Sequence, residues 1–277
     1  MLDTGRRVEA QRLRHHCAWW HSPGQYTVAR CLRALALHAT FSAQGWVARS
    51  AAARQAMDYT WHFQVVWDYR MVFVRGALVT AQITFWAVVI GLLLGLPLGL
   101  MRRSEMRLVR APAAGFIELF RSTPALVQLV WIYYSLPILT GLQMSSVVSV
   151  SIGLGLHAAA YFAEIFRAGV NSIGRGQWDA ARAIGMTYSQ AMRRIVLPQA
   201  VRRMVPPFIN EFASLIKLTT LGSALAVDEL LHEANNLINN TYRPLEIYTV
   251  LAVAFAVLIY PIIFFSQRLE QRWQRGQ

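Results

Sequence analysis

Residues 174–198 read GRGQWDAARAIGMTYSQAMRRIVLP, a polar, arginine-bearing segment set between long apolar runs. Residues 177–184 predict a short helix with Asp179 in its first turn, where a negative charge complements the exposed N–H groups. Gly185 suits the left-handed conformation that ends such a helix. The segment therefore begins as a short helix closed by a glycine.

The same segment continues with a second set of helix signals. Thr187 followed three residues later by Gln190 predicts a capping box, which starts another helix. Pro198 marks a boundary or a kink, because proline lacks the N–H that a helix interior needs. We expect a compact knob made of a helix, a glycine and a second helix, and such a knob between apolar runs suggests docking.

Composition places the rest of the chain in a membrane. The chain is 55% hydrophobic with only 15% charged residues, which is typical of membrane proteins. The net charge is +13, but the arginines fall in short clusters between apolar runs, which is typical of membrane topology, and no basic and aromatic groove pattern appears. We therefore expect a lipid bilayer, and no nucleic acid, as a partner.

Residues 1–56 differ from the remainder because they hold eight arginines, four histidines and both cysteines, without an apolar run of bilayer length. One interpretation is a basic arm that binds anionic lipid. The interpretation that we favour is a mis-assigned start, with translation beginning at Met57. Cys17 and Cys31 lack metal-ligand spacing and indicate no metal site.

From Met57 onward the pattern is regular. Residues 57–76 are aromatic and amphipathic, as expected at a membrane interface on the outer, periplasmic side. Five apolar segments then predict an all-α integral membrane protein with five transmembrane helices, and residues 268–277 form a tail. The spans are expected at about 77–101, 112–137, 146–168, 204–227 and 245–267.

Small residues punctuate the first span. Gly91, Gly95 and Gly99 repeat every four residues, which lets another helix approach closely. We favour this packing role over a gating role. Pro97 is expected to kink or end the regular helix nearby.

Arginine distribution sets the orientation. The loop at 102–110, the segment at 167–203 and the C-terminal tail hold nearly all the arginine that follows Met57, which predicts that they are cytoplasmic. The loops at 138–145 and 228–244 then face outward. A periplasmic N-terminus and a cytoplasmic C-terminus follow.

Several charged residues lie within the predicted spans. Glu118 and Arg121 are expected to form a structural pair, and His157 is expected to pack inside the bundle. Glu164 and Lys217 suggest a functional site, because an unpaired charge at membrane depth is costly. A structural pair or interfacial snorkelling explains Glu164 and Lys217 equally well.

Motifs for catalysis are missing from the sequence. It contains no GxxxxGK[ST] loop for phosphate, no HExxH and no GxSxG. We assign no catalytic residue, no metal and no cofactor to this chain and expect that it is not an enzyme. Any ATP that it uses is expected to be bound by a partner subunit.

The opening segment resembles the EAA loop of ABC importer permeases, which has an acidic residue, two alanines, three residues, glycine, nine residues and IxLP. The matching positions are Asp179, Ala180, Ala181, Gly185, Ile195, Leu197 and Pro198. FRSTPALVQL, AAYFAEIFRAGVNSIGRGQ and KLTTL resemble the polar amino acid uptake subfamily, which includes histidine, glutamine and glutamate permeases. Two departures are Asp179, where glutamate is usual, and Leu218, where aspartate is usual.

The resemblance implies a type I ABC importer fold with a cytoplasmic coupling helix between spans 3 and 4. It implies coupling to an ATP-binding ABC subunit through Gly176, Gln177, Asp179, Ala180, Ala181 and Gly185. A solute path past Glu164, Lys217 and Thr219 is the weaker expectation. The implied partners are a second permease subunit, copy or paralogue, and a periplasmic amino-acid-binding protein at a bacterial inner membrane.

The implied function is the pore subunit of an ATP-driven importer that moves polar amino acids inward by alternating access. One alternative is the same machinery for an opine or ectoine. Another is a secondary transporter driven by ion gradients, which usually needs more spans or an internal repeat. A third is a membrane scaffold that only recruits an ATPase.

Overall fold

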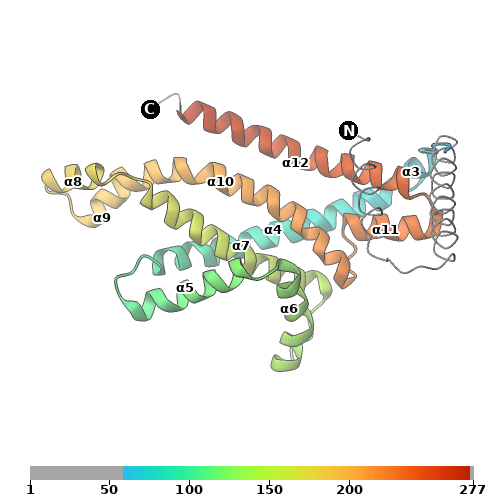
Figure 1. Cartoon of the computed structure of the whole chain (residues 1–277), viewed down its shortest axis with the longest axis horizontal. Coiled ribbons are helices and arrows are strands. Elements are labelled where there is room, and N and C mark those ends of the chain that lie inside the picture. The colour runs from blue at the N-terminus through green and yellow to red at the C-terminus, as the bar shows by residue number, and fades with distance from the viewer. Residues whose placement is uncertain (1–58, 275–277) are drawn as a thin grey trace, which may run out of the picture. The chain divides into compact units, whose positions relative to one another are not determined.

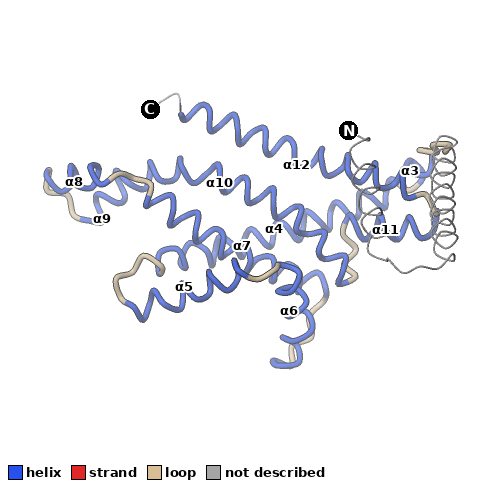
Figure 2. The backbone as a smooth tube through the Cα atoms, viewed as in Figure 1, coloured by secondary structure: helices blue, strands red, loops and turns tan. Residues whose placement is uncertain are grey.

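The computed structural model describes residues 59–274, so the expectations for residues 1–56 lie outside the described residues. Within this range the chain is helical and has no strand. Residues 62–274 belong to one compact unit (Figures 1 and 2). Its helices are α3 (Gln64–Asp68), α4 (Arg70–Met101), α5 (Arg107–Ser122), α6 (Ala125–Thr140), α7 (Ser146–Asn171), α8 (Arg175–Ala183), α9 (Tyr188–Ala191), the π-helical turn Met192–Val196, α10 (Leu197–Leu218), the 3₁₀ turn Thr219–Leu225, α11 (Leu230–Thr241) and α12 (Pro244–Gln274).

Three of the described helices, α4, α7 and α12, are long and apolar enough to cross a membrane. A fourth crossing is counted if α5 and α6 together form one span. The all-α class predicted from the apolar segments is confirmed for the part of the chain that the structure describes. The expected span at 204–227 corresponds to α10 and the 3₁₀ turn after it, which this test of length and hydropathy does not select.

The span expected at 112–137 is not one continuous helix. The chain breaks between α5 and α6, which are bent by 108° relative to each other. Thr123 is extended at ψ 144° and Pro124 at ψ 135°, as sterics demand of a residue before proline and of a proline that precedes a helix. Figure 1 shows α6 leaving the direction of α5 at this break.

Other boundaries differ in detail. Helix α4 begins at Arg70, inside the predicted interfacial segment, because no helix breaker separates that segment from the span. Pro97 lies inside α4 and does not end it. Helix α11, in the predicted loop at 228–244, was not anticipated, although Glu229 caps it by accepting hydrogen bonds from the amides of Leu231 and His232.

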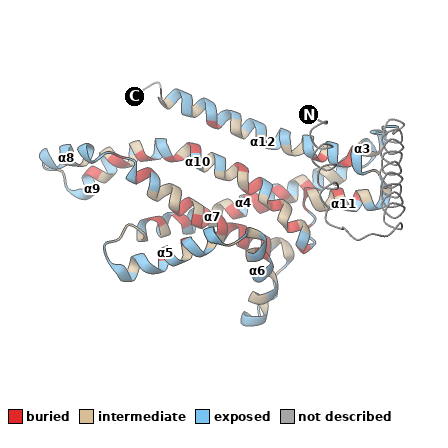
Figure 3. Cartoon of the chain, in the orientation of Figure 1, coloured by how far each residue is buried: buried red, intermediate tan, exposed pale blue. Residues whose placement is uncertain are grey.

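The core of the unit is built around α7. Helix α4 packs along it, and Figure 3 shows buried residues concentrated on α7. Ile83, Ala87, Leu129, Val150 and Leu154 form one completely or almost completely buried cluster from α4, α6 and α7. Helix α10 packs on α7 through the ring of Phe208, 5.0 Å from that of Phe162.

Close approach of α4 and α7 depends on the predicted glycine stripe. A Cβ atom added at Gly91 would lie 2.7 Å from the Cβ of Ala158. At Gly95 it would lie 2.8 Å from the carbonyl oxygen of Ala159, and at Gly99 it would lie 2.9 Å from that of Ala163. All three distances are below van der Waals contact, so the glycines let the helix backbones approach each other.

Helices α8 and α9 lie at one end of the unit, beyond the ends of α7 and α10, and α11 lies at the opposite end (Figure 1). The segment that joins α4 to α5 and the C-terminal end of α12 also point toward the α8 and α9 end. The three arginine-rich segments of the sequence are thus directed to the same end of the bundle.

Candidate functional site

Helix α7 carries a polar stripe that faces α5 and α6. His157, Tyr161 and Glu164 are spaced by four and three residues, so they share one face of the helix. The rings of His157 and Tyr161 lie 4.8 Å apart. His157 is buried, as predicted for a histidine packed in the bundle.

Glu164 binds two arginines. The guanidinium of Arg167 donates to both carboxylate oxygens, at 3.0 Å from Nε and 2.5 Å from Nη2. Arg121 of α5 approaches the same carboxylate at 3.9 Å and covers the ring of Tyr161 at 5.6 Å. Glu164 is thus a partly buried acid that joins α5 to α7.

The predicted pair of Glu118 with Arg121 is wrong. Glu118 instead accepts a 2.8 Å hydrogen bond from Arg102, which follows α4. The guanidinium of Arg102 also donates to the carbonyl oxygen of Ala114. Glu118 and Arg121 are three residues apart but do not pair with each other. Helix α5 contacts both α4 and α7, so Glu118 pairs with Arg102 at the end of α4 and Arg121 pairs with Glu164 of α7.

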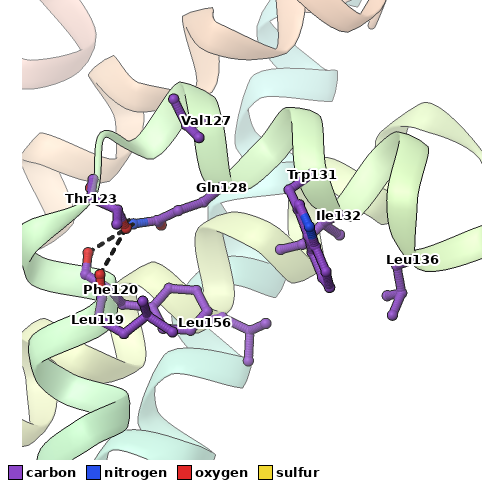
Figure 4. Close-up of a pocket in the computed structure, with 9 residues that line it drawn as sticks. All are labelled: Leu119, Phe120, Thr123, Val127, Gln128, Trp131, Ile132, Leu136 and Leu156. Atoms are coloured by element: carbon purple, nitrogen blue, oxygen red, sulfur yellow. Dashed lines mark hydrogen bonds between the residues drawn. The ribbon is translucent and has the colours of Figure 1, made fainter. Parts of the chain in front are cut away.

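Gln128, in the first turn of α6, ties the helix break together (Figure 4). Its amide nitrogen donates to the carbonyl oxygens of Phe120 and Thr123, at 2.8 and 3.0 Å, and lies 2.7 Å from the Thr123 hydroxyl. Its amide oxygen lies 3.1 Å from Nδ1 of His157. Carbonyl groups left open by the break therefore have a partner within the protein.

An apolar cavity of about 490 Å³ lies in the angle between α5 and α6. In Figure 4 the Gln128 side chain points toward Thr123 at one end of the group of lining residues, and Trp131 and Leu136 follow along α6. The lining residues are Leu119, Phe120, Thr123, Val127, Gln128, Trp131, Ile132, Leu136 and Leu156.

A second cavity of about 330 Å³ lies between α7 and α10. Glu164, Ser172 and Arg203 are the polar residues that line it. The Arg203 guanidinium donates to the carbonyl oxygen of Ser172, which links the two helices. This cavity offers an acidic and a basic side chain to a small polar molecule.

The structure does not bring Glu164, Lys217 and Thr219 into one site. The Thr219 side chain is buried, and its hydroxyl donates to the carbonyl oxygen of Ile216 within the same turn. Lys217 lies exposed near the end of α10, 14 residues beyond Arg203. At a rise of about 1.5 Å per residue this is roughly 21 Å along the helix.

The predicted knob is present as α8 and α9. Gly185 is left-handed at φ 76°, and Thr187 with Gln190 forms the capping box, so both conformational predictions are confirmed. The predicted place of Asp179 in the first turn is wrong, because Gly174 caps α8 and the helix begins at Arg175. Asp179 instead accepts a 2.6 Å hydrogen bond from Arg182.

Most of the knob surface is exposed. Gly176, Gln177, Asp179, Ala180 and Gly185 lie at the surface, whereas the predicted coupling residue Ala181 is buried. The rings of Trp178 and Tyr188 stack at 5.2 Å and hold α8 against α9. Exposed Ile184 and Tyr188 extend this surface and were missed by the sequence prediction.

A π-helical turn follows the knob. Residues 192–196 widen the backbone between α9 and α10, immediately before Pro198. Because proline has no N–H to donate, a regular helical hydrogen bond is missing at this point. The predicted boundary at Pro198 is thus a local change of helix type, and the chain continues from knob to bundle through it.

Residues 87–275 match the family described as "Binding-protein-dependent transport system inner membrane component". The chain is 34% identical to the probable amino-acid ABC transporter permease protein YckA of Bacillus subtilis over 72% of this chain and 88% of the relative. It is 32% identical to the glutamine transport system permease protein GlnP of Escherichia coli, over 78% and 98%.

A solved structure also resembles the chain. It is described as the crystal structure of an amino acid ABC transporter with histidines. The two share 33% sequence identity, with a TM-score of 0.73, over 77% of this chain and all of that one. The similarity therefore extends from sequence to fold.

Proposed function

From the premise that the chain belongs to the family of binding-protein-dependent transport system inner membrane components, we propose that it is the membrane subunit of an ATP-driven amino-acid importer. The observation that carries this function is the agreement of fold and sequence with an amino acid ABC transporter at 33% identity. Relatives named as amino-acid and glutamine permeases support it. The chain is accordingly a permease subunit and not an enzyme, and a separate subunit hydrolyses ATP.

The knob formed by α8 and α9 is the proposed contact with the ATP-binding subunit. Its exposed small and polar residues, Gly176, Gln177, Asp179, Ala180 and Gly185, allow close approach to a cleft on a partner. Ala181 supports the surface from inside the knob. The stacked rings of Trp178 and Tyr188 would move the two helices as one body.

Five spans remain our proposed topology: α4, the bent pair α5 and α6, α7, α10 with its 3₁₀ turn, and α12. The knob, the loop after α4 and the C-terminal end of α12 would face the cytoplasm of a bacterium, since arginine favours that side. Helix α11 and the N-terminal segment would face outward. A binding protein would deliver the solute on that outer side.

For the solute path, the cavity bordered by Glu164 and Arg203 supports a role for Glu164. An amino acid carries an ammonium and a carboxylate group, which match an acidic and a basic side chain. Lys217 and Thr219 receive less support, because they lie apart from this cavity. A second permease subunit, identical or paralogous, would complete the pore.

The test is uptake by the purified chain, reconstituted in proteoliposomes with its ATP-binding subunit and its binding protein. Radiolabelled amino acids and octopine are supplied outside, with ATP inside. We expect ATP-dependent uptake of an amino acid that an uncoupler does not affect. Loss of uptake on adding an uncoupler, with ATP maintained, would instead indicate a secondary transporter.

Two further outcomes are informative. Uptake of octopine in preference to every amino acid would assign the same machinery to an opine. Absence of uptake with all subunits present and ATP hydrolysed would favour a scaffold that only recruits the ATPase.

A further inference from the structure

Gln128, on α6, makes hydrogen bonds across the break to Phe120 of α5 and to Thr123. Its amide nitrogen has two hydrogens, and three oxygen atoms of Phe120 and Thr123 lie within 3.0 Å of it. These acceptors determine which end of the amide faces them. The amide oxygen must therefore be the atom that faces His157.

This orientation also determines the protonation of the histidine ring. The Gln128 oxygen is an acceptor, so Nδ1 of His157, 3.1 Å away, must carry a hydrogen. Neutral imidazole in peptides carries its hydrogen mainly on the other nitrogen, so the Nδ1–H form would report this contact. The contact thus has a spectroscopic signature.

Residues on both sides of the break contact the polar stripe of α7, which consists of His157, Tyr161 and Glu164. Gln128, after the break, binds His157; Arg121, before the break, lies over Tyr161 and beside Glu164. The three stripe residues follow one another on a single helix face. A change in the angle between α5 and α6 would therefore move Gln128 or Arg121 relative to this stripe.

We propose that Gln128 is a positioning residue for transport: by fixing the α5–α6 break to His157, it keeps Arg121 beside Glu164. The proposal rests on the proposed transport function, and it adds a residue that links α6 to the charged group on α7. Gln128 itself acts through His157 and the break, because its own hydrogen-bonding groups are occupied.

The first experiment compares Gln128→Met with wild type in the reconstituted complex, using radiolabelled L-glutamine and L-arginine as probes. Methionine keeps the length of the side chain and removes its hydrogen bonds. We expect the maximal uptake rate to fall by about tenfold or more while the half-saturating concentration changes by less than about twofold. ATP hydrolysis should continue, so that transport is uncoupled from it.

The matched control is Ser151→Ala. Ser151 is a buried polar residue on α7, the helix that carries His157, and its hydroxyl donates to the carbonyl oxygen of Val147 in its own helix. We expect wild-type uptake from it. Wild-type uptake by Gln128→Met would overturn the proposal.

The second experiment reads the His157 ring by ¹⁵N NMR in nanodiscs, with the signal assigned by its loss in His157→Gln. Hydrogen on Nδ1 in the wild type and its redistribution in Gln128→Met are expected. Hydrogen on Nε2 alone in the wild type would overturn the proposed contact. Because this measurement needs no transport, it tests the contact even if the wild-type complex takes up neither probe.

A third comparison tests the same contact with variants of His157, in case Gln128→Met does not fold. His157→Gln retains an N–H that can donate to Gln128, whereas His157→Leu does not. We expect His157→Gln to keep at least about a third of wild-type uptake and His157→Leu to lose it. Equal uptake by these two variants would contradict the proposal.

Discussion

The Arg121 guanidinium of α5 lies 3.9 Å from the Glu164 carboxylate of α7, although Glu118 is only one helical turn away on α5. Glu118 points to Arg102 instead. The Glu164 carboxylate therefore contacts two helices, since Arg167 binds it from α7 itself. This arrangement joins the helix break to the cavity between α7 and α10.

Replacing the shared acid tests that arrangement. Glu164→Gln removes the carboxylate that both Arg121 and Arg167 contact, in a partly buried setting where an unpaired charge is costly. We expect uptake to fall by about tenfold or more, with a lower unfolding temperature in detergent. Glu118→Gln is the control, because its side chain is 62% exposed; equal losses from both variants would contradict a special role for Glu164.

The glycine stripe leads to a stability prediction. In Gly95→Ala the new methyl group would lie 2.8 Å from the Ala159 carbonyl oxygen, so α4 and α7 must separate. We expect a loss of stability of about 1–3 kcal/mol, seen as a lower unfolding temperature by fluorescence in detergent. Gly115→Ala, where a methyl group meets nothing within 4 Å, should not lower it. A lower unfolding temperature in both variants would refute close helix packing as the cause.

Local features could be predicted from the sequence because they depend on residues within a few positions of one another. The left-handed Gly185 and the capping box of Thr187 with Gln190 are of this kind. The start of α8 was misplaced because its cap is a glycine, which lacks the side-chain signal of Ser, Thr, Asp or Asn.

Contacts between helices were not predictable in the same way. The partners of Glu118 and Arg121 follow from how α5 lies between α4 and α7, which sequence spacing does not encode. The break before Pro124 did carry a signal, but the apolar runs on both sides suggested one span. Gln128 could have been noticed as a polar residue in an apolar run, yet its link to His157 needed the fold.

Acidity should affect the end of the bundle at which α11 lies, through Glu229. Its side chain is fully buried at the start of α11, and burial raises the pKa of this carboxyl, although hydrogen bonds from the amides of Leu231 and His232 oppose the rise. The folded state then holds the proton more tightly than the unfolded state does. The contribution of Glu229 to stability is therefore greatest below the unfolded pKa and declines as pH rises toward the folded pKa.

The measurement is the difference in unfolding temperature between wild type and Glu229→Gln as pH rises from 4 upward. We expect the wild type to lose stability relative to the variant across the window from the ordinary glutamate pKa, about 4.3, to the raised folded value. Glu118→Gln reports the general effect of removing an exposed carboxyl. A difference that stays constant or moves in the opposite direction would refute the raised pKa.

The knob gives the most direct test of coupling, at Gly185. Its backbone is left-handed at φ 76°, and a methyl group added there would meet nothing within 4 Å, so any effect of substitution comes from backbone strain and not from a clash within this chain. A β-branched residue is strongly disfavoured in that conformation, at a cost of about 1–2 kcal/mol, whereas asparagine tolerates it. Gly185→Val should therefore distort the turn between α8 and α9, while Gly185→Asn should preserve it.

We expect Gly185→Val to reach the membrane in normal amount, to bind the ATP-binding subunit more weakly in co-purification, and to lose uptake. Gly185→Asn should retain most of the binding and most of the uptake. This comparison separates the effect of the turn's shape from the effect of losing glycine itself. Because the strain is confined to an exposed turn, the unfolding temperature of the membrane helices should change little in either variant. Wild-type uptake by Gly185→Val would contradict the need for this turn. If Gly185→Asn loses uptake to the same extent as Gly185→Val, then contact with the partner at this position limits coupling, and not the left-handed backbone.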